Sequence, residues 1–88
     1  MTERDVRFAA TLDDALAALD RAASALGGSF VLEEFAADFR SGHVEASGQA
    51  RLYVVILEDA PDVVVRVDTR DSLGERLADR LATEPDAI

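Results

Sequence analysis

The run of six consecutive apolar residues at positions 52–57 constrains the fold more than any other feature of the sequence. Valine, isoleucine and tyrosine favour extended backbone, so the run predicts a strand over residues 51–58. Side chains alternate between the two faces of a strand, which places Tyr53, Val55 and Leu57 on one face and the other three apolar residues on the opposite face. Both faces of this strand therefore need cover, whereas helices packed on one side of an antiparallel sheet cover only one.

The sequence predicts two amphipathic helices. The first begins after Thr11, a good N-cap residue, and ends at Gly27 and Gly28. Its apolar residues recur at helical spacing and are Leu12, Ala15, Leu16, Leu19, Ala23 and Leu26. The second begins at Ser72 and Glu75, which have the spacing of a capping box, and carries leucines at positions 73, 77 and 81. Residues 83–88 contain a proline and are predicted to form a frayed tail.

Four more strands are predicted over residues 6–9, 30–40, 43–47 and 63–68, because short apolar stretches there are bounded by turn-forming residues. Within residues 30–40 the apolar alternation changes phase, so we expect a β-bulge near Glu33 and Glu34. A helix over residues 33–39 is the alternative. We expect Ser41 and Gly42 to turn the chain into the next strand.

The resulting order is β-α-β-β-β-β-α within a single domain spanning residues 1–88. Two helices and an antiparallel sheet predict an α+β two-layer sandwich with both helices on one face of the sheet. This order resembles that of the TATA-binding-protein-like and related helix-grip folds. The resemblance is one of element order without a shared residue motif, so it implies a fold and no function.

Charge and composition exclude several classes of partner. Acidic residues outnumber basic ones by 18 to 9. The resulting net charge of −9 repels the phosphate backbone, so we expect no direct binding of nucleic acid. The longest apolar run is too short to span a bilayer, and the chain has no cysteine, so we expect a cytoplasmic protein with no membrane partner. All nine basic residues are arginine, which fits a salt-rich cytoplasm and an ordinary GC-rich genome equally well.

No motif for a catalytic site, metal site or cofactor is found, so we expect a non-enzymatic protein without cofactor or metal. His43, the only histidine, follows a predicted turn and is interpreted as a surface residue. Asp59 and Asp62 lack the spacing and the glycine of an EF-hand loop and are interpreted as part of a solvated turn.

The uncovered face of the 51–58 strand supplies the main functional hypothesis. The predicted interface residues are Tyr53, Val55, Leu57 and Val64, with Leu32 or Ala36 as extensions. A large exposed apolar patch usually marks an interface, and two-fold homodimers are the commonest oligomers. We therefore expect a homodimer that acts through protein–protein contact, with a curled sheet or a covering tail as the alternative.

Two other functions stay open. Helix-grip-like sheets can hold a ligand between sheet and helix, and Phe30, Phe35 and Phe39 are the candidate lining of such a pocket. Alternatively, the acidic surface docks on a basic nucleic-acid-binding protein, an association that salt would weaken.

Overall fold

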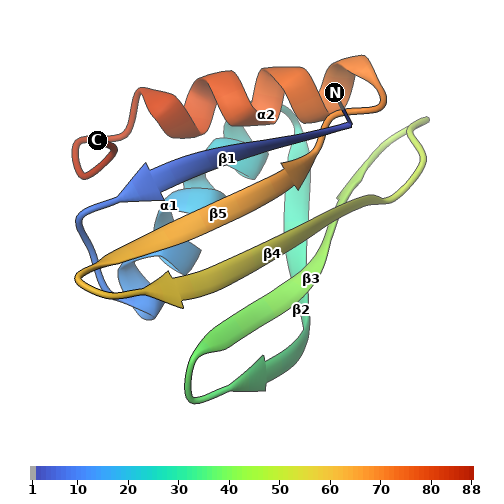
Figure 1. Cartoon of the computed structure of the whole chain (residues 1–88). Helices are drawn as coiled ribbons and strands as arrows, with labels where there is room; N and C mark the ends of the chain where they lie inside the picture. Colours follow the sequence, from blue (N-terminus) through green and yellow to red (C-terminus); the bar gives the residue numbers. More distant parts are fainter. Residues whose placement is uncertain (1) are drawn as a thin grey trace.

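The computed structural model describes residues 2–88. The elements, in chain order, are β1 (Glu3–Phe8), α1 (Leu12–Ala25), β2 (Gly28–Ala36), β3 (Phe39–Ala46), β4 (Leu52–Asp59), β5 (Asp62–Asp68) and α2 (Ser72–Ala82) (Figure 1). The order and the α+β class are those predicted from the sequence. The first strand is longer than predicted and begins at Glu3 rather than Val6.

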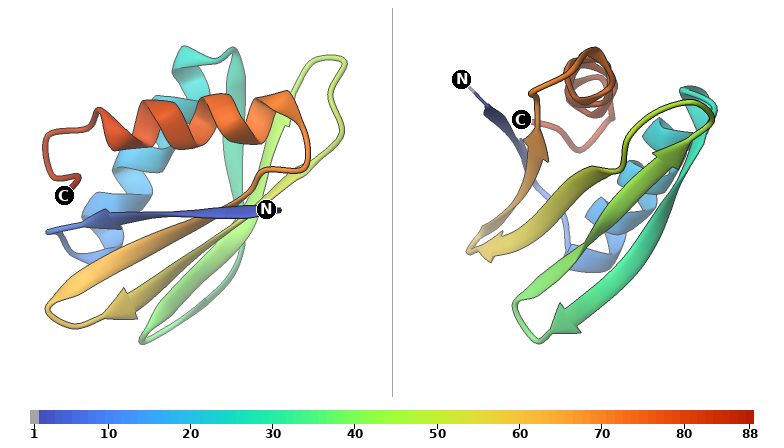
Figure 2. Two further views of the ribbon diagram at one scale, coloured as in Figure 1. Left: turned by 45° about the horizontal axis from the view of Figure 1, so that its top comes forward. Right: turned by 90° about the vertical axis from the view of Figure 1, so that its right-hand side faces the viewer.

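The five strands form one sheet in the order β1-β5-β4-β3-β2, and every neighbouring pair is antiparallel. Both helices lie on the same side of this twisted sheet (Figure 2). The architecture is therefore a two-layer sandwich, and the predicted arrangement of the helices is confirmed. It leaves the other sheet face without a helix.

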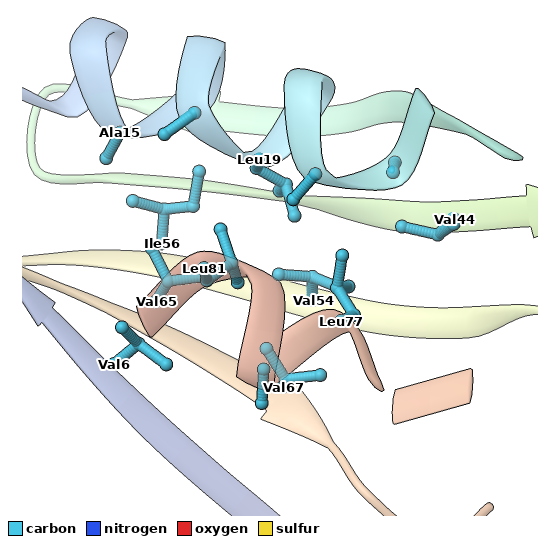
Figure 3. Packing of buried hydrophobic residues seen from close by; sticks show 14 of the residues in the cluster. Val6, Ala15, Leu19, Val44, Val54, Ile56, Val65, Val67, Leu77 and Leu81 are labelled. Carbon is cyan, nitrogen blue, oxygen red and sulfur yellow. The ribbon is translucent and has the colours of Figure 1, made fainter. Parts of the chain in front are cut away.

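The hydrophobic core lies between the helices and the sheet. Side chains of α1 and α2 point towards those of the central strands, as Figure 3 shows. The fully buried residues include Leu19 of α1, Leu77 and Leu81 of α2, and Val54, Ile56 and Val65 of the sheet. Alanines at positions 15, 18, 22 and 23 are also buried, so α1 presents small side chains to the sheet. These alanines belong to a packed core.

The predicted N-cap residue is confirmed for α1 and is wrong for α2. The Thr11 hydroxyl accepts a hydrogen bond from the backbone N–H of Asp14 at 3.1 Å, as predicted. In α2 the capping carboxylate belongs to Asp71, which accepts from the N–H of Gly74 at 3.3 Å. The capping box predicted at Ser72 and Glu75 is therefore wrong by one residue. Aspartate and serine both cap helices well, and two adjacent candidates make the start ambiguous.

The segment predicted as one strand over residues 30–40 is divided by a turn. The register between β2 and β3 shifts between Leu32 and Glu34, which confirms the bulge. The chain turns at Ala37 and Asp38 instead of at Ser41 and Gly42, because Ala36 already pairs with Phe39. Ser41 and Gly42 consequently lie inside β3.

The end of the chain lies along β1. The backbone N–H of Ala9 donates to the carbonyl of Asp86 at 2.9 Å, and the N–H of Ile88 donates to the carbonyl of Arg7 at 2.9 Å. An isolated β-bridge adds to these bonds. The predicted fraying of residues 83–88 is therefore not what the structure shows. The tail covers the outer edge of β1 only at its end, around Arg7 and Phe8, and leaves the helix-free face of the sheet uncovered.

Candidate functional site

The candidate site is the sheet face that carries no helix, here called the open face. Residues paired directly across antiparallel strands lie on the same face, so the register identifies its members. They include Val31, Glu34 and Ala36 of β2, Phe39, Ser41, His43 and Glu45 of β3, Tyr53, Val55 and Leu57 of β4, Val64 and Arg66 of β5, and Asp5 and Arg7 of β1.

Apolar side chains occupy the middle of the open face. Tyr53 is 53% exposed, and Val31, two strands away, is 39% exposed. Val55 and Leu57 are half-buried. The alternation within the 52–57 run thus places the three predicted β4 residues together on the face that the helices leave free.

Two residues predicted to belong to the interface, Val64 and Leu32, are not placed as expected. Val64 lies on the open face but is only 7% exposed, so it has little area to offer a partner. Leu32 pairs with Gly42, which in turn pairs with the core residue Val54, so Leu32 lies on the helix side. Ala36 does lie on the open face, beside Phe39. The bulge at Glu33 explains why two residues of one strand that are four apart in sequence lie on opposite faces.

Ion pairs form the β1/β5 margin of the open face. The pairs are Arg66 with Asp5, Arg7 with Asp59 and Asp62, and Arg70 with Asp68. Arg66 and Asp5 are direct cross-strand partners, and both ends of the carboxylate are engaged, at 2.9 and 3.1 Å. Such exposed pairs contribute little to stability, but they neutralise this margin locally.

A groove runs beside Tyr53 on the same face. Its volume is about 370 Å³, and its lining includes Tyr53, Val55, Arg66 and Arg70. The lining also includes Glu3 and Asp68, so the groove combines an apolar wall with two guanidinium groups and two carboxylates.

His43 lies at the centre of the β2/β3 half of the open face and is only 4% exposed. Its cross-strand partners are Val31 on one side and Tyr53 on the other, and the Tyr53 ring meets the imidazole edge-on at 6.2 Å. The imidazole Nδ1 lies 2.8 Å from Glu33 Oε1, and Nε2 lies 2.9 Å from Glu45 Oε1, so each ring nitrogen is within hydrogen-bond distance of a carboxylate. The interpretation of His43 as a surface residue at a turn is therefore wrong.

This Glu33–His43–Glu45 cluster favours the imidazolium. Carboxylates only accept hydrogen bonds, so both ring nitrogens must carry a hydrogen to satisfy both glutamates. The hydrogen bond to Glu33, followed by the one to Glu45, raises the pKa of His43, while burial and the nearby Arg51 charge oppose the rise. The same contact lowers the pKa of Glu45. Because both nitrogens are engaged, the cluster holds a charge in place and leaves no free nitrogen to act as a general base.

The sequence contained one signal for this cluster that was missed. His43 and Glu45 are two residues apart, so any strand that contains both places them on the same face. The strand predicted over residues 43–47 already contains both residues, but the turn assigned to Ser41 and Gly42 led to the interpretation of His43 as a surface residue.

The three phenylalanines predicted to line a pocket are not brought together. Phe30 and Phe35 lie on the helix side, where Phe30 packs against the core and Phe35 is 72% exposed. Phe39 pairs with Leu57 and lies on the open face. The Arg40 guanidinium stands 5.9 Å from the centre of the Phe35 ring.

Within residues 2–88, no group of three or more histidine, cysteine, aspartate or glutamate side chains is placed to hold a metal ion. Over the same part of the chain, no helix has both the length and the apolarity needed to cross a membrane. No protein-family model, curated protein or solved structure matches this chain.

Proposed function

We propose that this chain is a non-enzymatic binding domain that forms a homodimer through its open face. One observation carries the proposal: Tyr53, Val55 and Val31 expose apolar surface on the sheet face opposite the helices. Contiguous apolar surface on a small protein usually marks an interaction site. The cytoplasmic location expected from the sequence stays a prediction.

The distribution of charge favours a second copy in one orientation. The β2/β3 margin carries Glu33, Glu34 and Glu45, whereas on the β1/β5 margin Arg7 and Arg66 are paired with aspartates. A two-fold axis parallel to the strands, between two facing sheets, places the carboxylate margin of one copy over the ion-paired, locally neutral margin of the other. An axis perpendicular to the strands would oppose the two carboxylate margins, which like-charge repulsion disfavours.

The groove beside Tyr53 supports the same arrangement. It opens on the open face next to the most exposed large apolar side chain of that face, so the Tyr53 ring of one copy can enter the groove of the other. Tyrosine is well suited to such a position because it buries a large apolar ring and keeps a polar tip at the rim.

Two variants test the proposal. Tyr53→Asp puts a charge in the middle of the proposed interface and should convert the dimer to a monomer, as judged by light scattering after gel filtration. Phe35→Asp is the matched control, because Phe35 is more exposed than Tyr53 but lies on the helix side. The Phe35→Asp protein should stay dimeric. A dimeric Tyr53→Asp protein, or a Phe35→Asp protein that alone becomes monomeric, would show that the open face is not the interface.

The net charge of −9 favours a second candidate, docking on a basic protein. The salt dependence of the association distinguishes the two candidate functions. Two copies of like charge repel each other, so salt should strengthen the homodimer, whereas salt should weaken a complex with a basic partner.

A further inference from the structure

We propose that the Glu33–His43–Glu45 cluster makes self-association pH-dependent, with the dimer favoured while His43 is protonated and weakened when it loses its proton. This inference rests on the proposed homodimer and concerns the regulation of the same face.

The position of the cluster places it inside the proposed interface. His43 lies between Val31 and Tyr53 in one cross-strand row, and both neighbours are exposed apolar residues of the open face. A second copy that covers Tyr53 and Val31 therefore also covers the cluster, and removes water from the carboxylates of Glu33 and Glu45.

The geometry ties the charge of the cluster to one proton. A neutral imidazole has a single N–H, so it can satisfy only one of the two carboxylates. The other carboxylate oxygen would then face a nitrogen lone pair at 2.8 or 2.9 Å. The net charge of the cluster is thus −1 when His43 is an imidazolium and −2 when the ring is neutral. In the neutral state one of the two carboxylates has no N–H to accept from.

The charged and titratable groups around His43 come from three strands and one turn. Glu33 approaches from β2, Glu45 from β3 itself and the Tyr53 ring from β4. Arg51, which precedes β4, has its guanidinium 3.7 Å from Glu45. Arg51 is 60% exposed and supports only Glu45, so it does not replace the imidazolium at Glu33.

Burial under a second copy increases the affinity of His43 for its proton. An unpaired carboxylate is costly to remove from water, whereas a carboxylate hydrogen-bonded to an imidazolium is much less so. The dimer therefore binds the His43 proton more tightly than the monomer does. By linkage, the association constant falls as the pH rises through the pKa of His43.

The sequence makes this effect easy to isolate. His43 is the only histidine and the chain has no cysteine, so no other side chain ordinarily titrates between about pH 5.5 and pH 8.5.

Sedimentation equilibrium over this pH range tests the inference, in about 1 M sodium chloride so that the repulsion between copies is screened. The dissociation constant of the unmodified dimer should rise at least about tenfold from about pH 5.5 to about pH 8.5. Glu34→Gln is the matched control, since Glu34 pairs with Ser41 on the same face, and it should keep this dependence. His43→Gln and Glu33→Gln should each flatten it, and Glu33→Gln serves if His43→Gln does not fold.

The outcomes separate this inference from the proposed function. A dimer whose dissociation constant is the same across the range overturns the pH dependence and leaves the homodimer standing. A dependence that persists in both His43→Gln and Glu33→Gln assigns it to other groups and also overturns the inference. A monomer at every pH removes the homodimer, and the inference with it.

Discussion

His43 is a buried basic side chain on a sheet face that is otherwise apolar at its centre. Hydrogen bonds to two glutamates offset the cost of burying its charge. Its pKa in the folded protein lies above the ordinary value of about 6.5. The ionised cluster therefore stabilises the fold fully below about pH 6.5, and this contribution is lost as the pH rises through the folded pKa.

The two glutamates should have unequal effects on His43. Glu33→Gln removes the largest cause of the raised pKa, so the pKa of His43 should fall towards its ordinary value, and it should fall further than in Glu45→Gln. An NMR titration of the imidazole measures both shifts. If the pKa of His43 is the same in Glu33→Gln as in the unmodified protein, Glu33 does not hold the imidazolium.

Gly42 was expected to turn the chain and instead permits a close approach within the sheet. A Cβ atom at this position would collide with the carbonyl oxygen of Val31 and would stand 2.9 Å from the tip of the Phe30 ring. We therefore expect Gly42→Ala to lower the free energy of unfolding by at least about 1 kcal/mol in urea denaturation. Ser41→Ala, on the opposite face, should change it by no more than about 0.5 kcal/mol. Equal stability of the two variants would contradict the packing of Phe30 over Gly42.

At the scale of elements, periodicity predicted the helices and most strands because each signal is local. The 52–57 run is rich in β-forming residues and does form a strand, and the phase change in residues 30–40 correctly indicated a bulge. The hairpin turn was misplaced because Phe35, Ala37 and Phe39 alternate as if in one strand, although Ala36 pairs with Phe39. The packing of the tail on β1 depends on contacts far apart in sequence, and no local pattern signals it.

The start of α2 gives a direct comparison between the sequence-based assignment and the structure. Asp71→Ala removes the carboxylate that caps Gly74 and should cost about 1 kcal/mol of unfolding free energy. Ser72→Ala should cost less than about 0.5 kcal/mol, because Ser72 is exposed and already within the helix. A larger loss in Ser72→Ala than in Asp71→Ala would favour the capping box at Ser72.

At the scale of the whole molecule, the helices cover one sheet face and the tail covers the end of the β1 edge, so the open face is the sheet face left uncovered, with Tyr53 and Val31 exposed on it. The alternation in residues 52–57 predicted this face and its central residues Tyr53 and Val55. The charged cluster beside Tyr53 was not predictable to the same extent, because Glu33 and His43 meet only once the register between β2 and β3 is known.

Charge and apolar surface act in opposite directions on self-association. Each copy carries −9, so repulsion opposes the approach of two copies at low ionic strength, whereas burial of the open face favours it. Molar salt shortens the screening length to about 3 Å, so burial of apolar surface should then outweigh the repulsion between the two copies. We therefore expect the dimer to be tighter in molar salt than in dilute buffer.

The solution mass of the unmodified chain, measured by light scattering in dilute buffer and in molar salt, tests the central claim most directly. The open-face homodimer predicts a mass of twice 9.4 kDa in molar salt, with a smaller dimer fraction in dilute buffer. A mass of 9.4 kDa under both conditions, at concentrations where a weak dimer would form, would contradict it.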